Sequence, residues 1–321
     1  MRNKSIKLIF KTSIGLVLFF WMAYALYNQL RRQEDLQEIL HQMFLEWDAR
    51  RIYLLVSVVF LMVINWTIEA QKWRYLLLGT ERFSLWTSLQ SVLTGLAVSV
   101  ITPNRIGEYM GRILFLRNVH KLQGITVTIV GSFAQLIVTG FLGLIGLIYY
   151  INQIKSTQWI YWLLAGSLVL CIVLGYFYFN LPTFVEKLST IPFLRKVKTY
   201  LLIVRRFHAS QLLRILFLSF LRYGIYTTQF VLLLKLLWVE VPLVDMVLTI
   251  WLIFWAMAIV PTIAIAEIGI RGETALYFLA PLSQNHVGIV TATILLWLIN
   301  LIIPALFGCL FVFRMKIYDD E

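Results

Sequence analysis

Charged residues occur at two places where the chain should still lie inside a membrane. The segment TPNRIGEYMGRILFLR (102–117) directly follows an apolar run, and the segment AEIGIRGETALYFL (266–279) lies within another apolar region. Their acidic and basic residues are Arg105, Glu108, Arg112, Glu267, Arg271 and Glu273, apart from Arg117 at the end of the first segment. A guanidinium group matches phosphate oxygens with two parallel hydrogen bonds and stays charged at physiological pH. These residue types therefore predict a binding site for a phosphate-bearing headgroup.

The spacing within the first segment favours local ion pairs. If RIGEYMGR is helical, Glu108 lies three residues after Arg105 and four before Arg112, on the same face as both. Charges at membrane depth persist only where they pair with one another or line a watery cavity. We expect Glu108, Glu267 and Glu273 to orient the arginines, or to carry protons if transport is coupled.

Arg222 adds a further cation to this set. It lies about ten residues into an apolar segment, whereas an arginine that reaches the membrane surface is expected nearer an end. We expect it to face the same cavity, with Glu69 or one of the glutamates above as its partner. The predicted substrate-binding residues are Arg105, Glu108, Arg112, Arg222, Glu267, Arg271 and Glu273. An alternative left open is that these ions are purely structural.

The composition is that of an integral membrane protein. Apolar residues make up 60% of the 321 residues, aromatic residues 15%, and the mean hydropathy is +0.81. The net charge of +12 comes from short clusters beside apolar segments, which is typical of orientation signals and argues against nucleic-acid binding. The two cysteines lie in apolar segments and the four histidines have no ligand spacing, so no disulfide, metal or cofactor is predicted.

Hydropathy divides the chain into eight apolar segments within one domain, 1–321. They are residues 8–27, 52–70, 85–101, 124–151, 159–180, 212–238, 245–265 and 287–313. The first imitates a secretory signal but ends in bulky aromatic residues, so we interpret it as an uncleaved helix.

Eight simple crossings would place the most basic connection outside the cell. If instead 85–116 and 245–285 are re-entrant hairpins from opposite faces, 18 of the 28 Lys and Arg residues lie inside, 6 outside and 4 at membrane depth. The sequence therefore predicts an all-α polytopic protein with six full spans and two hairpins, both termini being cytoplasmic. The expected break points are Pro103, Gly107, Pro261, Gly269 and Gly272. Interrupted segments entering from opposite faces also indicate an inverted repeat with a binding site near the midplane.

Two further features concern the membrane surface. The stretch 192–208 mixes apolar residues with five basic ones, which indicates an interfacial helix on anionic lipid or, equally, a basic orientation loop. The aromatic residues beside spans are typical of the belts at the two membrane interfaces; they are Trp159, Tyr161, Trp162 and Trp238.

At its two charged motifs the sequence resembles the flippase-like membrane domain of lysylphosphatidylglycerol synthases. The matching residues are TPNRIGEYMGRILFLR (102–117), AEIGIRGETALYFL (266–279) and WLINLIIPALFG (297–308). The resemblance implies a stand-alone bacterial or archaeal cytoplasmic-membrane protein that moves lipids or lipid-linked molecules between leaflets. The family's cytoplasmic aminoacyl transferase domain would be absent, and the second motif lacks the commoner Gly-Gly form.

Three functions remain open at this point. The leading hypothesis is a non-enzymatic lipid transporter whose partner is a membrane phospholipid or lipid-linked substrate. The alternatives are an intramembrane enzyme acting on a phospholipid or polyprenyl phosphate, with Glu108 or Glu273 as base, and a non-transporting partner of an envelope enzyme. The sequence leaves open whether the chain forms a homo-oligomer.

Overall fold

The computed structural model describes residues 48–78, 80–100, 102, 106–117, 121–153, 158–188, 202–259 and 264–314. Within these ranges the secondary structure is helical throughout, without a strand. Five of the described helices are long and apolar enough to cross a membrane: α3 (Ala49–Leu76), α6 (Lys121–Gln153), α7 (Gln158–Phe179), α10 (Ala209–Leu236) and the continuous helix His286–Phe311. The prediction of an all-α polytopic membrane protein is confirmed. The predicted segment 8–27 lies outside the described residues.

The last of these helices contains a π-helical turn. It consists of α13 (His286–Trp297), the π segment η4 (Leu298–Ile302) and α14 (Ile303–Arg314). Pro304 has no N–H with which to continue the ladder to Asn300, and the backbone N–H of Ile303 donates to the carbonyl of Leu298. The wider turn therefore lies where proline interrupts the regular hydrogen bonding.

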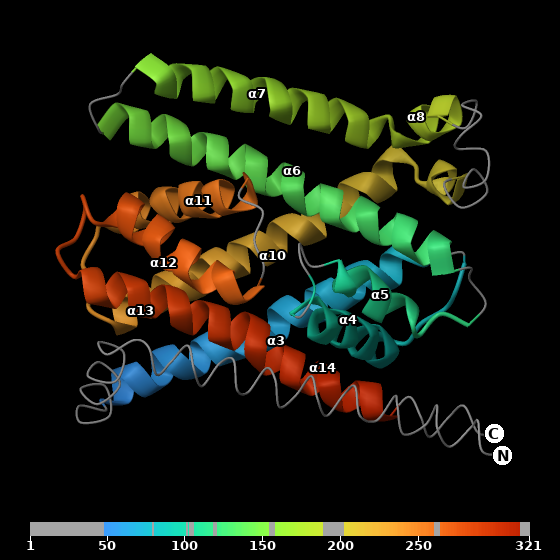
Figure 1. Ribbon diagram of the computed structural model, residues 1–321, viewed down its shortest axis with the longest axis horizontal. Coiled ribbons are helices and arrows are strands. Elements are labelled where there is room, and N and C mark those ends of the chain that lie inside the picture. Colours follow the sequence, from blue (N-terminus) through green and yellow to red (C-terminus); the bar gives the residue numbers. More distant parts are fainter. Residues whose placement is uncertain are drawn as a thin grey trace.

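Four shorter helices form two helical hairpins at opposite ends of the bundle. The first pairs α4 (Leu85–Ser99) with α5 (Gly107–Ile113), and the second pairs α11 (Leu243–Ile259) with α12 (Ala264–Leu279). Figure 1 shows the α4–α5 hairpin toward the end where α3 finishes and α6 begins, and the α11–α12 hairpin at the other end. This arrangement agrees with the two predicted hairpins. The number of full crossings and the orientation stay predictions.

The α4–α5 hairpin closes through glycine contacts. A Cβ atom on Gly111 would lie 2.5 Å from the Cα of Gly95 and 2.7 Å from the carbonyl oxygen of Thr94, so only glycine permits this approach. Gly107 begins α5, where its N–H donates to Thr102 Oγ1 at 2.8 Å. Gly107 therefore lies where α5 begins after the break, as predicted, and Pro103 lies outside the described residues.

The α11–α12 hairpin packs on α6 in the same way. A Cβ atom on Gly146 would lie 2.5 Å from the carbonyl oxygen of Leu248 and 2.9 Å from the amide nitrogen of Leu252. The prediction that Gly269 and Gly272 break the chain is wrong, because α12 continues through both residues. A glycine inside a helix lowers stability by about 1 kcal/mol relative to alanine but leaves the hydrogen-bond ladder intact. The described helices are interrupted instead at 260–263, and Pro261 lies outside the described residues.

The remaining short elements lie at the end of the bundle where α7 finishes. They are α8 (Leu181–Leu188) and the 3-10 helix η3 (Leu202–Arg206). Arg206 of η3 donates a hydrogen bond to the carbonyl oxygen of Leu76, the last residue of α3. Most of the predicted interfacial stretch, residues 192–201, lies outside the described residues.

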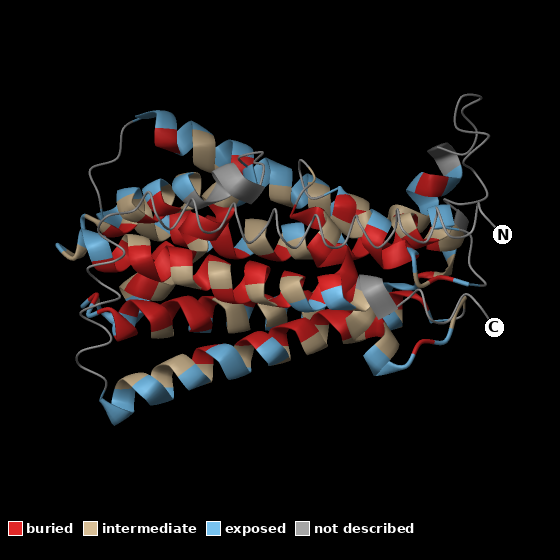
Figure 2. Ribbon diagram, turned by 60° about the horizontal axis from the view of Figure 1, so that its bottom comes forward, coloured by how far each residue is buried: buried red, intermediate tan, exposed pale blue. Residues whose placement is uncertain are grey.

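Burial follows the expected membrane pattern. Figure 2 shows buried residues concentrated along the middle of the bundle and exposed residues on the outer helix faces. The buried residues include large apolar side chains such as Phe230, Leu233 and Met246. The aromatic residues predicted to form belts are all exposed at the ends of helices: Trp159, Tyr161, Trp162 and Trp238. Their exposure agrees with the predicted contact with the membrane interface.

Candidate functional site: a charged cavity between two hairpins

Helix α3 carries a polar stripe on an otherwise apolar span. Asn65, Glu69 and Lys72 recur at spacings of four and three residues, which places them on one helix face. All three are buried, at 3%, 3% and 2% exposure. The predicted apolar segment 52–70 ends before Lys72, whereas α3 extends to Leu76 and Lys72 is buried within it.

Glu69 lies between three cations. Its Oε1 accepts from Arg112 Nη2 at 2.7 Å, and its Oε2 contacts Lys72 Nζ at 2.7 Å. The same Oε2 is paired with Arg222 Nη1. A single buried carboxylate therefore holds together side chains from α3, α5 and α10. With Glu108, which pairs with Arg112, these residues are called here the Glu69 cluster: Glu69, Lys72, Glu108, Arg112 and Arg222.

The two arginines of the Glu69 cluster have similar surroundings. The guanidinium carbon of Arg112 lies 5.6 Å from the ring centre of Trp73, and that of Arg222 lies 5.4 Å from the ring centre of Trp66. Arg222 also donates from Nε to Asn65 Oδ1 at 3.0 Å. Ion pairs and aromatic faces together hold both guanidinium groups at membrane depth, where an unpaired charge is costly.

A cavity of about 520 Å³ lies beside the Glu69 cluster. Its wall draws on both hairpins and on four of the long helices. Glu108 comes from the first hairpin and Arg271 from the second, while Glu69, Lys72 and Arg222 complete the charged side. The two hairpins come from opposite ends of the bundle, and the cavity is lined by residues of both (Figure 1).

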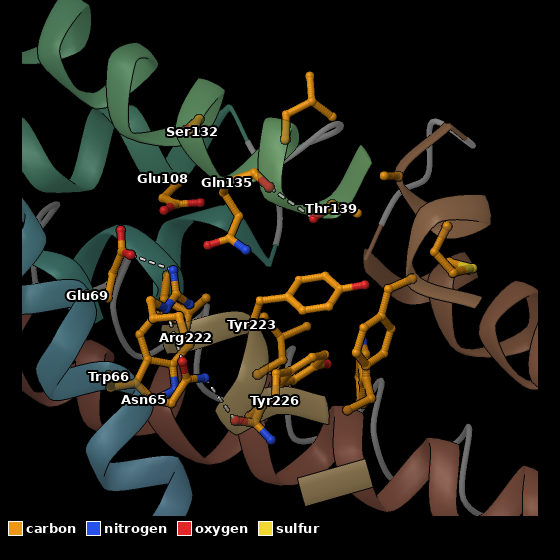
Figure 3. A pocket seen from close by; sticks show the side chains of 18 of the residues that line it. Asn65, Trp66, Glu69, Glu108, Ser132, Gln135, Thr139, Arg222, Tyr223 and Tyr226 are labelled. Carbon is orange, nitrogen blue, oxygen red and sulfur yellow. Dashed lines mark hydrogen bonds and ion pairs between the residues drawn. The ribbon is translucent and has the colours of Figure 1, made fainter. Parts of the chain in front are cut away.

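Helix α6 forms a polar wall and an opening of the cavity. Ser132, Gln135 and Thr139 line it at spacings of three and four residues, and Figure 3 shows Gln135 pointing inward toward the side on which Arg222 lies. Ser132 and Leu136 line the cavity and are also exposed on the surface. The cavity is therefore open through the side of the bundle, at α6.

The remaining wall is aromatic. Tyr223, Tyr226 and Phe254 line the cavity, and the ring centres of Tyr223 and Tyr226 lie 5.6 and 5.0 Å from that of Phe254. Figure 3 shows the two tyrosines on the far side of Arg222 from Glu69. The cavity therefore offers charged and polar groups on one side and apolar ring surface on the other, as an amphipathic ligand requires.

Several buried polar atoms around the cavity have no hydrogen-bond partner among the described residues. On residues that line the cavity, the donors are Trp66 Nε1 and Trp297 Nε1, and the acceptor is Gln135 Oε1. Buried polar atoms are hydrogen-bonded in the great majority of native structures, so an orphan atom calls for an explanation. Two of these three atoms on the cavity wall are donors.

The structure brings together part of the predicted site. Glu108, Arg112 and Arg222 meet as expected, and Glu69 is the partner of Arg222. Arg271 lines the same cavity. Glu273 is exposed and does not line the cavity, because it lies two residues after Arg271 and points from another face of α12. Arg105 and the side chain of Glu267 lie outside the described part of the chain.

Sequence reasoning missed Asn65, Lys72 and the polar face of α6. The polar faces of α3 and α6 could have been recognised in the sequence, because their polar residues recur at helical spacing within segments of high hydropathy. Two polar side chains of α10 make contacts within the bundle: Gln229 donates to the carbonyl oxygen of Val58 at 2.9 Å, and Thr228 to that of Gly224 at 2.9 Å. These are contacts between and within helices.

Comparison with known proteins agrees with this fold. The family model of the lysylphosphatidylglycerol synthase TM region matches residues 8–308. The chain belongs to this family. The matched residues include both hairpins and every residue that lines the cavity, so the charged cavity is part of the lysylphosphatidylglycerol synthase TM region itself. A comparison with curated proteins finds no match.

Proposed function

We propose that this protein moves a phospholipid or lipid-linked molecule between membrane leaflets and binds its phosphate-bearing headgroup in the charged cavity. The observation that carries the proposal is the position of the Glu69 cluster beside an open cavity lined by residues of two opposed hairpins. Opposed interrupted segments around a central site are the usual basis of alternating access in transporters.

Among the three cations of the Glu69 cluster, Arg222 is the one best placed to contact the headgroup. Its side chain is 19% exposed, whereas those of Lys72 and Arg112 are 2% and 3% exposed. Lys72 and Arg112 also contact Glu69, so the carboxylate keeps two cationic partners if Arg222 turns toward a phosphate. Arg222 can therefore exchange one anionic partner for another without leaving a buried carboxylate unpaired.

The open side at α6 suits a lipid substrate. A headgroup entering past Ser132 would meet Gln135 and then the charged side of the cavity, while its acyl chains remain in the bilayer. Such a path avoids the large cost of moving a charged headgroup through hydrocarbon.

The test is lipid translocation by the purified protein in liposomes. A phospholipid with a fluorophore on an acyl chain is placed in both leaflets, and a membrane-impermeant quencher or extracting agent reports its arrival at the outer leaflet. Wild-type protein is expected to accelerate this movement, and Arg222→Gln to slow it about tenfold or more, since charged hydrogen bonds contribute about 1.5–3 kcal/mol.

The matched control is Arg214→Gln. Arg214 lies on the same helix, is exposed and does not line the cavity. Wild-type rates in Arg214→Gln together with a large loss in Arg222→Gln would support the site. Equal rates in wild type, both variants and protein-free liposomes would reject the proposed function.

A further inference from the structure

We propose that the cavity selects lipids whose headgroup carries a net negative charge, and that Lys72 and Glu108 set this preference in opposite directions. The inference rests on the proposed function and narrows its substrate class. It is carried by the balance of charges and of unpaired hydrogen-bond donors around the cavity.

The Glu69 cluster carries more positive than negative charge. Lys72, Arg112 and Arg222 are three cations, and Glu69 and Glu108 are two carboxylates. Arg271, a further cation, lines the same cavity. Arg105 and the side chain of Glu267 lie outside the described part of the chain, so this balance covers the described side chains alone. The described site therefore lacks at least one negative charge for neutrality.

The unpaired polar atoms show the same imbalance. Among the described residues that line the cavity, two buried donors lack an acceptor, on Trp66 and Trp297, against one buried acceptor on Gln135 without a donor. Within the described part of the chain Lys72 has one ion-pair partner, Glu69, although an ammonium group has three N–H donors. An anion supplies charge and acceptor oxygens together, whereas an ammonium-bearing headgroup supplies further donors and cations.

The family takes its name from a lipid whose headgroup is cationic. A lysyl group contributes two ammonium groups to a phosphodiester, so the headgroup of lysylphosphatidylglycerol is net positive. In this cavity the lysyl headgroup would add positive charge where positive charge is already in excess. Like charges repel strongly at low dielectric. The structure therefore favours an anionic headgroup, such as phosphatidylglycerol or a polyprenyl phosphate, over the aminoacylated lipid.

The experiment compares three lipids with the same acyl chains and acyl-chain fluorophore. They are phosphatidylglycerol, phosphatidylethanolamine and a stable lysyl analogue of phosphatidylglycerol. The full-length protein is examined in nanodiscs by native mass spectrometry for lipid binding, and in liposomes for translocation. We expect phosphatidylglycerol to bind and move at least about tenfold better than the lysyl analogue, the difference a single unit charge can make at such distances.

Two variants test the cause of the preference. Lys72→Gln removes one cation and is expected to reduce the ratio of anionic to cationic lipid bound. Glu108→Gln removes one carboxylate and is expected to raise that ratio. Loss of packing would move both variants the same way, so opposite shifts are specific to charge. The side chain of Glu108 is 28% exposed, so Glu108→Gln should disturb folding less than a change at a buried residue. The Glu108→Gln variant therefore still tests the inference if Lys72→Gln fails to fold.

Exposed residues provide the matched controls. Arg74→Gln removes a cation from the same helix as Lys72, and Glu240→Gln removes a carboxylate near the opposite end of the bundle; neither residue lines this cavity. Both variants are expected to keep the wild-type ratio. If the ratio changed in these controls as much as in Lys72→Gln, the effect would come from the overall charge of the protein surface. That result would overturn the inference.

The possible outcomes separate this inference from the proposed function. Translocation that is indifferent to headgroup charge would overturn the preference and support lipid transport. Preferred binding of phosphatidylglycerol without any translocation would support the preference and overturn lipid transport. Inorganic phosphate serves as a competitor: displacement of the lipid at equal concentration would show a site for free anions and overturn the lipid as the ligand.

Discussion

Arg112 and Glu69 are 43 positions apart in the chain and form an ion pair at 2.7 Å that joins α5 to α3. Both side chains are almost fully buried. Helix α5 has seven residues, far fewer than an isolated helix needs for stability in water. Helix α5 is therefore held by tertiary contacts, among them this ion pair and the close approach of Gly111 to Gly95.

Replacing Glu69 should reduce stability more than replacing any other charged residue of the cluster. Glu69→Gln leaves three cations without their shared carboxylate, and removal of one partner from a buried ion pair costs about 3–5 kcal/mol. Glu108→Gln should cost far less, because Glu108 has one ion-pair partner among the described residues and a partly exposed side chain. The midpoint of thermal unfolding in detergent checks this order. An equal midpoint for the two variants would contradict the central role of Glu69.

The close approach of α4 and α5 predicts a strong effect of a single methyl group. In Gly95→Ala the new Cβ atom would lie 2.7 Å from the carbonyl oxygen of Glu108 and 2.9 Å from Arg112 Cγ. Overpacking of this kind costs about 1–3 kcal/mol. Gly166→Ala in α7 is the control, since a Cβ atom there has no neighbour within 4 Å, and it should be neutral or stabilise by up to about 1 kcal/mol. Similar losses of thermal stability in both variants would refute the contact.

A bulky side chain at the opening of the cavity should stop lipid entry without unfolding the protein. Ser132→Trp places an indole where the residue is exposed and lines the cavity. Ile129→Trp is the control: Ile129, about one turn earlier on α6, is also exposed but does not line the cavity. We expect translocation to fall severalfold in the first variant and to stay at the wild-type rate in the second. Normal transport by a folded Ser132→Trp protein would place the entry route elsewhere.

The two hairpins predict a pattern of chemical labelling. After replacement of Cys171 and Cys309 by alanine, single cysteines are introduced at the exposed positions Arg82, Arg117, Glu240 and Gln284. Cysteines at Arg82 and Arg117 should react with an impermeant maleimide from one side of the membrane, and cysteines at Glu240 and Gln284 from the other.

Simple crossings would give a different labelling pattern. If 85–101 crossed the bilayer, Arg82 and Arg117 would lie on opposite sides. The backbone N–H of Arg117 instead lies 3.2 Å from Glu81 Oε1, next to Arg82, which brings the two ends of the first hairpin together.

The sequence predicted the fold class and the two interrupted segments because charge and proline within apolar runs have few explanations in a membrane. It also predicted the pairing of Glu108 with Arg112, since four residues make one helical turn. Both inferences depend on residues that are close together in the chain, and their spacing can be read directly from the sequence.

The sequence could not reveal which distant charges meet. Lys72 is close enough to the end of α3 to suggest a loop, and only the packing of α5 and α10 against α3 turns its face into the interior. Glu273 shows the opposite error: it shares a motif with Arg271, but two residues along a helix is about half a turn, so the side chains point apart. A sequence motif identifies the segment that contributes to a site. The angular position of each residue around the helix determines which of its side chains face that site.

The π segment η4 has a consequence for how this chain tolerates changes in length. Because its turn holds an extra residue, all of α14 is rotated by about 100° relative to an uninterrupted α-helix. Deleting one residue from 298–302 would remove the wide turn and rotate Gly308 away from Leu93 of α4, against which it packs. One extra residue in this turn therefore determines which face of α14 packs against α4 of the first hairpin.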